Sequence, residues 1–571
     1  MKVIGYIKIW MCCIMPFIVM SQDFTNIKSQ KPFAFNGSLE LRGSFYGASG
    51  ISNRMDPFNY YVSGSPTISL YGWSIPLSIM WSQKQTSFQQ PFNQIGLSPT
   101  YKWVTLHAGY RNVSFSPYTL AGHTMLGGGV ELNPGKLRFG FMHGKLNRAT
   151  VIDTMSMSLI PYSFSRSGTA VKIGFGTNSS FFDLNFLRAK DDSTSVAPLV
   201  VQQKVKINPA SNSVLGYATK FTVINKFFFE SDGAVSLYTR DINSPLSVDS
   251  IANKTLRKFG NFLDVNGSSE WFLAFNGGIG YREKNYGVKL NYRRIEPGFT
   301  SMGAYYFSND IENFTVNPNY NHPSGKLSIN GSFGVERDNV RLQKEATSKR
   351  IIGSGNISSQ LSQNFGVDIN FNNYSNNQSP NTLKFADSLK IVQTTRTIGL
   401  MPRYTIVHKD YVQMILLSAN FSNMNDYNSY FDNVQNNVSS RDIKTGQYLL
   451  TYNISMPLKK LSLNSSLSYT NLESQSNKNN YKGISVGSNY IMMKDKLSTG
   501  ANVSYMIGNN NTNKSNIFNG NINLGYKINK MQSLRAMLYF MDNNPGSAII
   551  GGNPAFSETR GEIAYQLNFG L

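Results

Sequence analysis

The sequence predicts an all-β fold, a single large antiparallel transmembrane β-barrel, and three observations predict it. Apolar and polar residues alternate with a period of two in many segments about ten residues long, the length of a tilted membrane-crossing strand. Charged residues make up 15% of the chain, against about 25% in an ordinary soluble protein. Short turns alternate with longer polar stretches along the chain, as they do in bacterial barrels.

We interpret residues 1–21 as a signal peptide. Lys2 and Lys8 give a positively charged start, and residues 9–20 form an apolar stretch that ends just before the expected cleavage site at Gln22. An N-terminal membrane anchor is the less favoured alternative, because a spanning helix needs roughly 20 apolar residues. The chain is therefore expected to be exported.

Both cysteines, Cys12 and Cys13, lie inside this signal, so the mature protein is expected to have no disulfide and no cysteine nucleophile. Past residue 21 there is no apolar run of roughly 18 residues or more, which excludes a helical membrane protein. We expect a short N-terminal segment at residues 22–37, followed by one barrel domain at residues 38–571.

Residues 271–282 and 286–293 show the alternation most clearly, and residues 283–285 form the turn between them. Trp271, Leu273 and Phe275 fall on one face of the first segment, whereas Gly and Asn occupy most of the other face. This pair reads as a hairpin with an apolar outside and a polar inside. Residues 521–528 and 534–540 repeat the pattern.

The last segment, residues 562–571, alternates to Leu571 and resembles the C-terminal targeting strand that the barrel-insertion machinery reads. A soluble β-sandwich, propeller or solenoid is the alternative fold. We disfavour it because the second face of many strands is too polar to be packed in a core. At about 20 to 25 residues per strand and connection, roughly 22–26 strands are expected, and an even number closes a bacterial barrel.

The connections are expected to be short periplasmic turns and longer extracellular loops. We place the long loops at residues 188–212, 239–263, 373–388, 422–441 and 508–515. The Gly-rich run at residues 127–129 lies inside a strand-like segment, where it indicates a bulge or close backbone packing rather than a phosphate-binding loop.

The five histidines do not form a pair at a metal-binding or HExxH spacing. His107, His123 and His143 are close enough in sequence to meet on neighbouring strands, but we predict no metal site and no cofactor. No GxSxG elbow, Walker loop or EF-hand pattern is present. A loop-borne hydrolase is the least favoured function, because the sequence does not bring a nucleophile and a base together. We therefore predict a non-enzymatic protein.

The net charge is +22, or about +20 without Lys2 and Lys8. Some of the basic residues fall on the polar face of their strands, where a ring of cations would favour anions in a pore. Contacts with anionic lipid headgroups and a general compositional bias are the plainer explanations. Nucleic acid is not an expected partner, because the basic residues are spread along the whole chain. The candidate lumen-facing residues are Arg138, Lys172, Arg282, Lys289, Arg293, Lys527 and Arg535.

Residues 92–99, 101–103, 107–111 and 115–119 together resemble uncharacterised outer-membrane β-barrel proteins of the Bacteroidota, and residues 134–149 extend the likeness. The resemblance covers about 60 residues. It implies a place in the cell outer membrane, with outer-membrane lipid and lipopolysaccharide as surroundings. It supplies no catalytic or binding residue. TonB-dependent receptors of the same bacteria are a less good match, because they need a plug domain before the barrel.

Two functions remain open. The chain could form a passive diffusion pore or structural barrel, which predicts a polar lumen and a measurable conductance. It could instead be an accessory component of a cell-surface protein secretion or assembly complex, which predicts a blocked lumen and stable protein partners.

Overall fold

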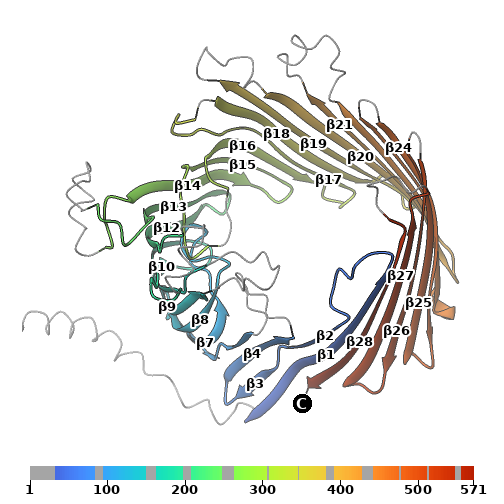
Figure 1. The fold of residues 1–571 in the computed structure, drawn as a ribbon, viewed down its shortest axis with the longest axis horizontal. Helices are drawn as coiled ribbons and strands as arrows, with labels where there is room; N and C mark the ends of the chain where they lie inside the picture. Colours follow the sequence, from blue (N-terminus) through green and yellow to red (C-terminus); the bar gives the residue numbers. More distant parts are fainter. Residues whose placement is uncertain are drawn as a thin grey trace, which may run out of the picture.

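The protein forms one closed antiparallel β-barrel (Figure 1), which confirms the predicted fold class. The structure, a computed structural model, describes residues 32–83, 94–149, 163–196, 207–246, 263–304, 308–344, 346–380, 391–426, 442–474, 477–510, 513–546 and 554–570. No helix within these residues is long and apolar enough to cross a membrane.

The strands fall into two groups along the chain. The first is β1 (Phe33–Ser49), β2 (Phe58–Gly64), β3 (Thr67–Leu70), β4 (Trp73–Ser82), β5 (Gln94–Leu97), β6 (Thr100–Tyr101), β7 (Val104–Asn112), β8 (Thr124–Leu132), β9 (Leu137–Asn147), β10 (Arg166–Gly176), β11 (Phe181–Asp191), β12 (Ser211–Val223), β13 (Phe227–Thr239), β14 (Ser269–Arg282) and β15 (Tyr286–Ile295). The second is β16 (Ile311–Asn321), β17 (Leu327–Arg337), β18 (Ala346–Gln360), β19 (Phe365–Pro380), β20 (Ile391–Val407), β21 (Val412–Asp426), β22 (Ile443–Met456), β23 (Leu461–Ser474), β24 (Asn477–Met492), β25 (Leu497–Asn510), β26 (Asn513–Lys527), β27 (Gln532–Asn544) and β28 (Phe556–Gly570), with a 3₁₀ turn η4 (Pro457–Lys459).

Two barrel strands are each split by a Ser-Pro pair. β2 and β3 both pair with β1 and flank Pro66, and β5 and β6 both lie along β7 and flank Pro99. Proline has no N–H group to give to a ladder, so the pairing is interrupted there. The 28 segments therefore make 26 strands, an even number at the top of the expected range.

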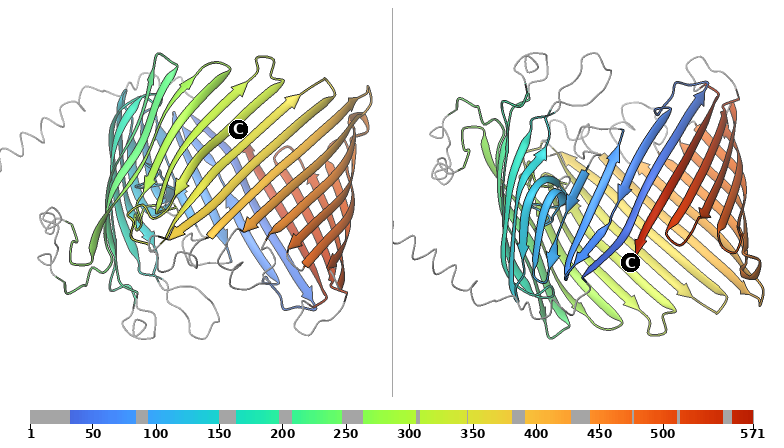
Figure 2. Two further views of the ribbon diagram at one scale, coloured as in Figure 1. Left: turned by 90° about the horizontal axis from the view of Figure 1, so that it is seen from above. Right: turned by 90° about the horizontal axis from the view of Figure 1, so that it is seen from below.

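The barrel closes between its first and last strands. β1 pairs with β28 from Asn36 opposite Gly570 to Ser49 opposite Ser557, and Figure 1 shows the two strands side by side. Closure leaves no open sheet edge, and every strand can satisfy its backbone groups inside the ring. Figure 2 shows the strands tilted in the same sense around the barrel.

The predicted hairpin is present as β14 and β15, with residues 283–285 as its turn. The side chains of Trp271, Ile279 and Tyr286 on its outer face are 40%, 57% and 51% exposed. Apolar side chains stay exposed on this face because its solvent is hydrocarbon rather than water. The predicted alternation is thus confirmed for this hairpin.

The connections are of two lengths. Turns of two to five residues join the strands at one end of the barrel, and most connections at the other end are much longer, up to residues 240–268. Two of the expected long loops are wrong in extent. β19 continues to Pro380, and β25 and β26 leave only residues 511–512 between them, because ladder hydrogen bonds hold these Asn-rich segments as strands.

β1 begins at Phe33, before the expected boundary at residue 38, and residues 1–21 lie outside the described part of the chain. The Gly-rich run lies in β8, where close packing explains it: a Cβ on Gly129 would lie 2.1 Å from the Met142 sulfur.

Candidate functional site

Two loops at the long-loop end fold into the barrel and pack against each other. They are residues 113–123, between β7 and β8, and residues 296–304, between β15 and β16. The Ala121 N–H donates to the Gly303 carbonyl at 3.0 Å, and the Ser301 hydroxyl donates to the Thr119 carbonyl at 2.5 Å. We call these segments the inward loops.

The inward loops cover the inner face of β8–β15, which we call the covered wall. Leu120 and Phe299 from the loops are each 1% exposed, and they meet Leu187 and Val214 of the wall, which are fully buried. A hydrogen bond also joins a loop to the wall, since the Met302 N–H donates to Asn212 Oδ1 at 3.0 Å. Burying each large apolar side chain stabilises this contact between loops and wall by about 1.5–3 kcal/mol. One side of the lumen is therefore a packed core.

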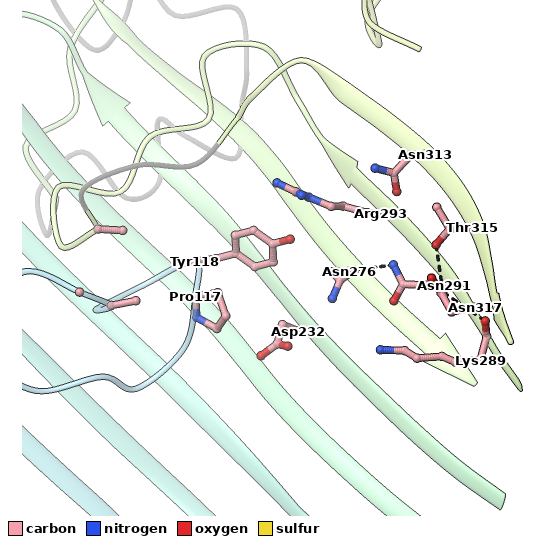
Figure 3. A pocket seen from close by; sticks show the side chains of 13 residues that line it. Pro117, Tyr118, Asp232, Asn276, Lys289, Asn291, Arg293, Asn313, Thr315 and Asn317 are labelled. Carbon is pink, nitrogen blue, oxygen red and sulfur yellow. Dashed lines mark hydrogen bonds between the residues drawn. The ribbon is translucent and has the colours of Figure 1, made fainter. Parts of the chain in front are cut away.

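A polar cleft of about 790 Å³ lies beside the inward loops (Figure 3). Tyr118 from one loop faces Arg293 of β15 across it, and Asn276 of β14 accepts a hydrogen bond from Asn291 at 3.0 Å. The Nε of Arg293 is buried and has no hydrogen-bond partner among the described residues. The cleft is lined by Pro117, Tyr118, Ala121, Gly122, Asp232, Asn276, Lys289, Asn291, Arg293, Ala304, Asn313, Thr315 and Asn317.

Four of the seven predicted lumen residues form an ion pair with a carboxylate side chain. Arg138 pairs with Asp183 at 2.8 Å, and the Lys172 ammonium lies 3.6 Å from Glu131. The other two pairs are Lys289 with Glu230 and Arg535 with Glu40. These carboxylates offset the positive charge of four of the residues that the sequence predicted to attract anions.

The remaining three predicted residues differ in their surroundings. The Arg282 guanidinium lies over the Phe228 ring, 4.9 Å from its centroid. Arg293 lines the cleft. Lys527 is exposed at the end of β26, on the same face as Asn523. The seven residues therefore do not come together as one ring of free cations.

The inner face of β17–β28, which we call the bare wall, carries polar side chains without a cover. Met537, which points inward with Arg535, is 52% exposed, and inward-facing Leu449 is 38% exposed. Among the described residues of these strands, the buried apolar ones are two alanines, Ala419 and Ala564. No described segment fills the lumen against this wall.

Amide side chains on the bare wall stand in rows that cross the strands in register. Glycines interrupt the rows and let the amides approach each other: a Cβ on Gly487 would lie 2.3 Å from Asn464 Oδ1 and 2.8 Å from Asn502 Nδ2. Asn356 donates to Asn370 at 2.6 Å in the longest row. The rows are Asn330, Asn356, Asn370, Gly399, Asn420 and Gln447; Asn453, Asn464, Gly487, Asn502 and Asn521; and Asn489, Gly500 and Asn523.

A buried serine, a buried histidine and a half-buried glutamate form a hydrogen-bonded chain under the first inward loop. His107 Nδ1 lies 2.8 Å from Ser98 Oγ, and its Nε2 lies 3.2 Å from Glu131 Oε1. This chain could not be predicted from the sequence, because Ser98 lies between β5 and β6, His107 in β7 and Glu131 in β8, and no fixed spacing links them. The set resembles a catalytic triad in composition.

Its geometry opposes catalysis. The residue after Ser98 is Pro99, which has no N–H group to stabilise an oxyanion. Serine also meets Nδ1 of the imidazole, whereas in the usual triad it meets Nε2. Phe115 of the inward loop lies over Lys172, the second partner of Glu131, with 4.9 Å between ammonium and ring centroid. We interpret this Ser–His–Glu set as polar groups that hydrogen-bond to one another below the loop.

The described residues hold no group of three or more His, Cys, Asp or Glu side chains that could bind a metal ion. His107 and His143 lie on strands, each with a hydroxyl partner, and His123 lies at the end of the first inward loop. The three histidines, which are close enough in sequence to lie on neighbouring strands, therefore each have a different hydrogen-bond partner.

No family model and no curated protein matches this chain. The solved structures that are similar to it include the following three. OccAB4 of Acinetobacter baumannii has 13% identity over 68% of this chain and 97% of its own, with a TM-score of 0.28. The FrpB iron transporter from Neisseria meningitidis has 9% identity over 93% and 81%, with a TM-score of 0.40. The P pilus usher (PapC) translocation pore has 9% identity over 94% and 99%, with a TM-score of 0.35.

Proposed function

We propose that this chain is a passive, non-enzymatic diffusion pore of the cell outer membrane, which passes small polar solutes with little discrimination by charge. The bare wall carries the proposal. It offers amide and hydroxyl groups to the lumen, and no described residue covers them. Such a wall replaces some of the hydration of a polar solute without holding it tightly.

The amide rows favour neutral polar solutes in particular. Asn330 and Asn356 of the longest row are exposed, so this row presents amide groups to the lumen. An amide offers one acceptor and two donors at low electrostatic cost, which suits hydroxyl-rich solutes such as sugars. Because the rows run across the strands, a solute that leaves one amide meets the next.

The ion pairs explain the weak charge selectivity that we expect. Lys289 and Arg535 each form an ion pair with a glutamate two strands away, Glu230 of β13 and Glu40 of β1, and this carboxylate offsets the positive charge. Arg350 with Glu336 and Arg403 with Asp368 extend the pairing around the bare wall. Among the predicted lumen residues, Arg282, Arg293 and Lys527 form no ion pair with a described carboxylate, and Arg293 is the one of these three that lines the cleft.

Conductance and reversal potential in planar bilayers test the proposal. The wild-type protein should conduct steadily with a permeability ratio of anion to cation near one. Glu230→Gln plus Glu40→Gln should make the pore prefer anions, because these changes release Lys289 and Arg535. Lys289→Glu plus Arg293→Glu should make it prefer cations. Arg240→Glu, a charge change on an exposed long-loop residue, serves as the control.

A folded, inserted protein that passes no current would overturn the pore. The accessory barrel of a secretion or surface-assembly complex would then be the better reading, and purification from membranes under mild conditions would identify its partners. If the protein conducts but none of the four lumen substitutions changes its ion selectivity, these residues do not line the path of the ions.

A further inference from the structure

The two ends of the barrel differ sharply in charge. The twelve short turns carry eleven lysines, no arginine and three acidic residues. The thirteen connections at the long-loop end carry 14 basic and 13 acidic residues, and six of the basic ones are arginines. The lysines, all exposed, are Lys102, Lys136, Lys226, Lys284, Lys326, Lys409, Lys459, Lys460, Lys494, Lys496 and Lys530.

We call this ring of turns the lysine rim. Nine of the twelve turns contribute at least one lysine, and these turns lie between β6 and β27 around most of the circumference. Within the rim, Lys226 pairs with Glu283 at 2.5 Å and Lys460 with Asp495 at 2.6 Å, and the twelve turns hold three acidic residues against eleven lysines. The rim therefore keeps a large positive charge that its own acidic residues do not balance.

Apolar side chains stand beside the rim lysines. Ile224, Leu458 and Met493 lie in or next to the same turns and are 79%, 77% and 62% exposed. Ile224 has a φ of 54°, a left-handed conformation that a β-branched residue rarely adopts. An apolar side chain next to a lysine fits the border of a bilayer, where the apolar part enters the acyl layer and the ammonium reaches the headgroups.

We propose that the lysine rim binds the anionic phospholipid headgroups of the leaflet that surrounds the short-turn end. A lipid surface meets the whole circumference at once, whereas a protein partner would meet an arc of it. The composition points the same way, because protein interfaces are enriched in arginine and depleted in lysine. A lysine ammonium is a mobile point charge that suits a fluid layer of phosphates. This inference does not depend on the pore.

Lipid selectivity around the reconstituted full-length protein tests the proposal. The protein is placed in bilayers of phosphatidylcholine with a trace of spin-labelled phosphatidylglycerol or spin-labelled phosphatidylcholine. The motionally restricted fraction of each label gives their relative association with the barrel. We expect a severalfold preference for phosphatidylglycerol at low salt, which decreases in 0.5 M KCl, an ionic strength that gives a Debye length of roughly 4 Å.

Two variants with equal charge change separate the rim from the net charge. The rim variant carries Lys284→Gln, Lys326→Gln, Lys459→Gln and Lys494→Gln, and should lose most of the preference. The control variant carries Arg54→Gln, Arg148→Gln, Arg240→Gln and Lys344→Gln at the long-loop end, and should keep it. Heat-dependent migration on gels verifies that each barrel is folded.

Equal losses in both variants would show that net charge, not the rim, selects the lipid, and would overturn the proposal. So would a wild-type protein without preference. If that protein instead bound an acidic periplasmic protein and the rim variant did not, the rim would be a protein interface.

Discussion

The covered wall and the bare wall belong to the same barrel but follow different physical rules. Inward-facing Leu187 and Val214 of the covered wall are fully buried, whereas inward-facing Met537 of the bare wall is 52% exposed. The inward loops make the difference, because they provide a second layer against which an inner face can pack. An inner strand face thus becomes core wherever a loop returns to it, and remains a polar lining elsewhere.

The largest effect should come from removing the apolar contacts of the inward loops. Leu120→Ala plus Phe299→Ala creates cavities on the covered wall, and each change costs about 2–5 kcal/mol in comparable cores. We expect the loops to undock while the ladders keep the barrel closed. Limited proteolysis within residues 113–123 measures undocking of the loops. Urea unfolding in lipid measures the stability of the barrel.

Met537→Ala is the matched control, since truncating a half-exposed side chain should change stability by less than about 0.5 kcal/mol. If the two variants had equal effects on unfolding and on protease access, the covered wall would not be a packed core distinct from the bare wall.

Acid should weaken the inward loops next. Burial lowers the pKa of His123 from 6.5 to about 4, because the charged imidazolium loses its hydration in this site. The undocked loop therefore takes up a proton before the docked loop does. Docking should be constant above pH 6.5 and should lose about 1.4 kcal/mol for each pH unit between 6.5 and 4.

Hydrogen exchange of residues 113–123, corrected for the intrinsic rate at each pH, measures this loss. His123→Gln keeps a polar side chain but cannot titrate, and should remove the pH dependence. An unchanged pH dependence in that variant would assign it to another group.

The Ser98 chain should matter for stability and not for chemistry. Ser98→Ala leaves His107 Nδ1 without its partner, a loss of about 1–3 kcal/mol for a buried polar group. A fluorophosphonate probe should leave the wild-type serine unlabelled, because Pro99 offers no N–H to an oxyanion. Labelling of Ser98, detected by peptide mass spectrometry, would reverse this assignment and revive the hydrolase.

The outer face of the barrel could be predicted from the sequence, and the covered wall could not. Alternation fixes which residues of β14 and β15 face outward, because the period of two is a property of one strand. The partner of an inward residue depends on distant segments. Lys172 and Glu131 are both charged residues on polar faces, yet only the fold shows that they meet.

One sequence signal for the covered wall was present. Leu184, Phe186 and Leu187 place apolar side chains on both faces of β11, which breaks the alternation seen in β26. A strand that is apolar on both faces is expected to be buried on one of them. What covers it could not be inferred. Residues 113–123 carry no Lys, Arg, Asp or Glu and include Val113, Phe115 and Leu120, but nothing in the sequence shows that they return to the inner face of β11.

The smallest effect on stability, and the most specific one on transport, is expected on the bare wall. Gly487→Leu places a side chain between Asn464 and Asn502, which lie on either side of this glycine in one amide row. The amides can swing into the lumen, so the cost in stability should be about 1 kcal/mol. The row itself is broken and the lumen is narrowed there.

If the amide rows guide neutral solutes, Gly487→Leu should slow the entry of sugars into liposomes more than it lowers ion conductance. Gly520→Leu is the control, because Gly520 lies on the outer face, where its nearest neighbour is the Phe518 ring at 3.9 Å. An equal fall in sugar entry and ion conductance would mean that the substitution only narrows the pore. A fall in sugar entry alone would assign solute guidance to the amides, which distinguishes this wall from an inert water-filled lining.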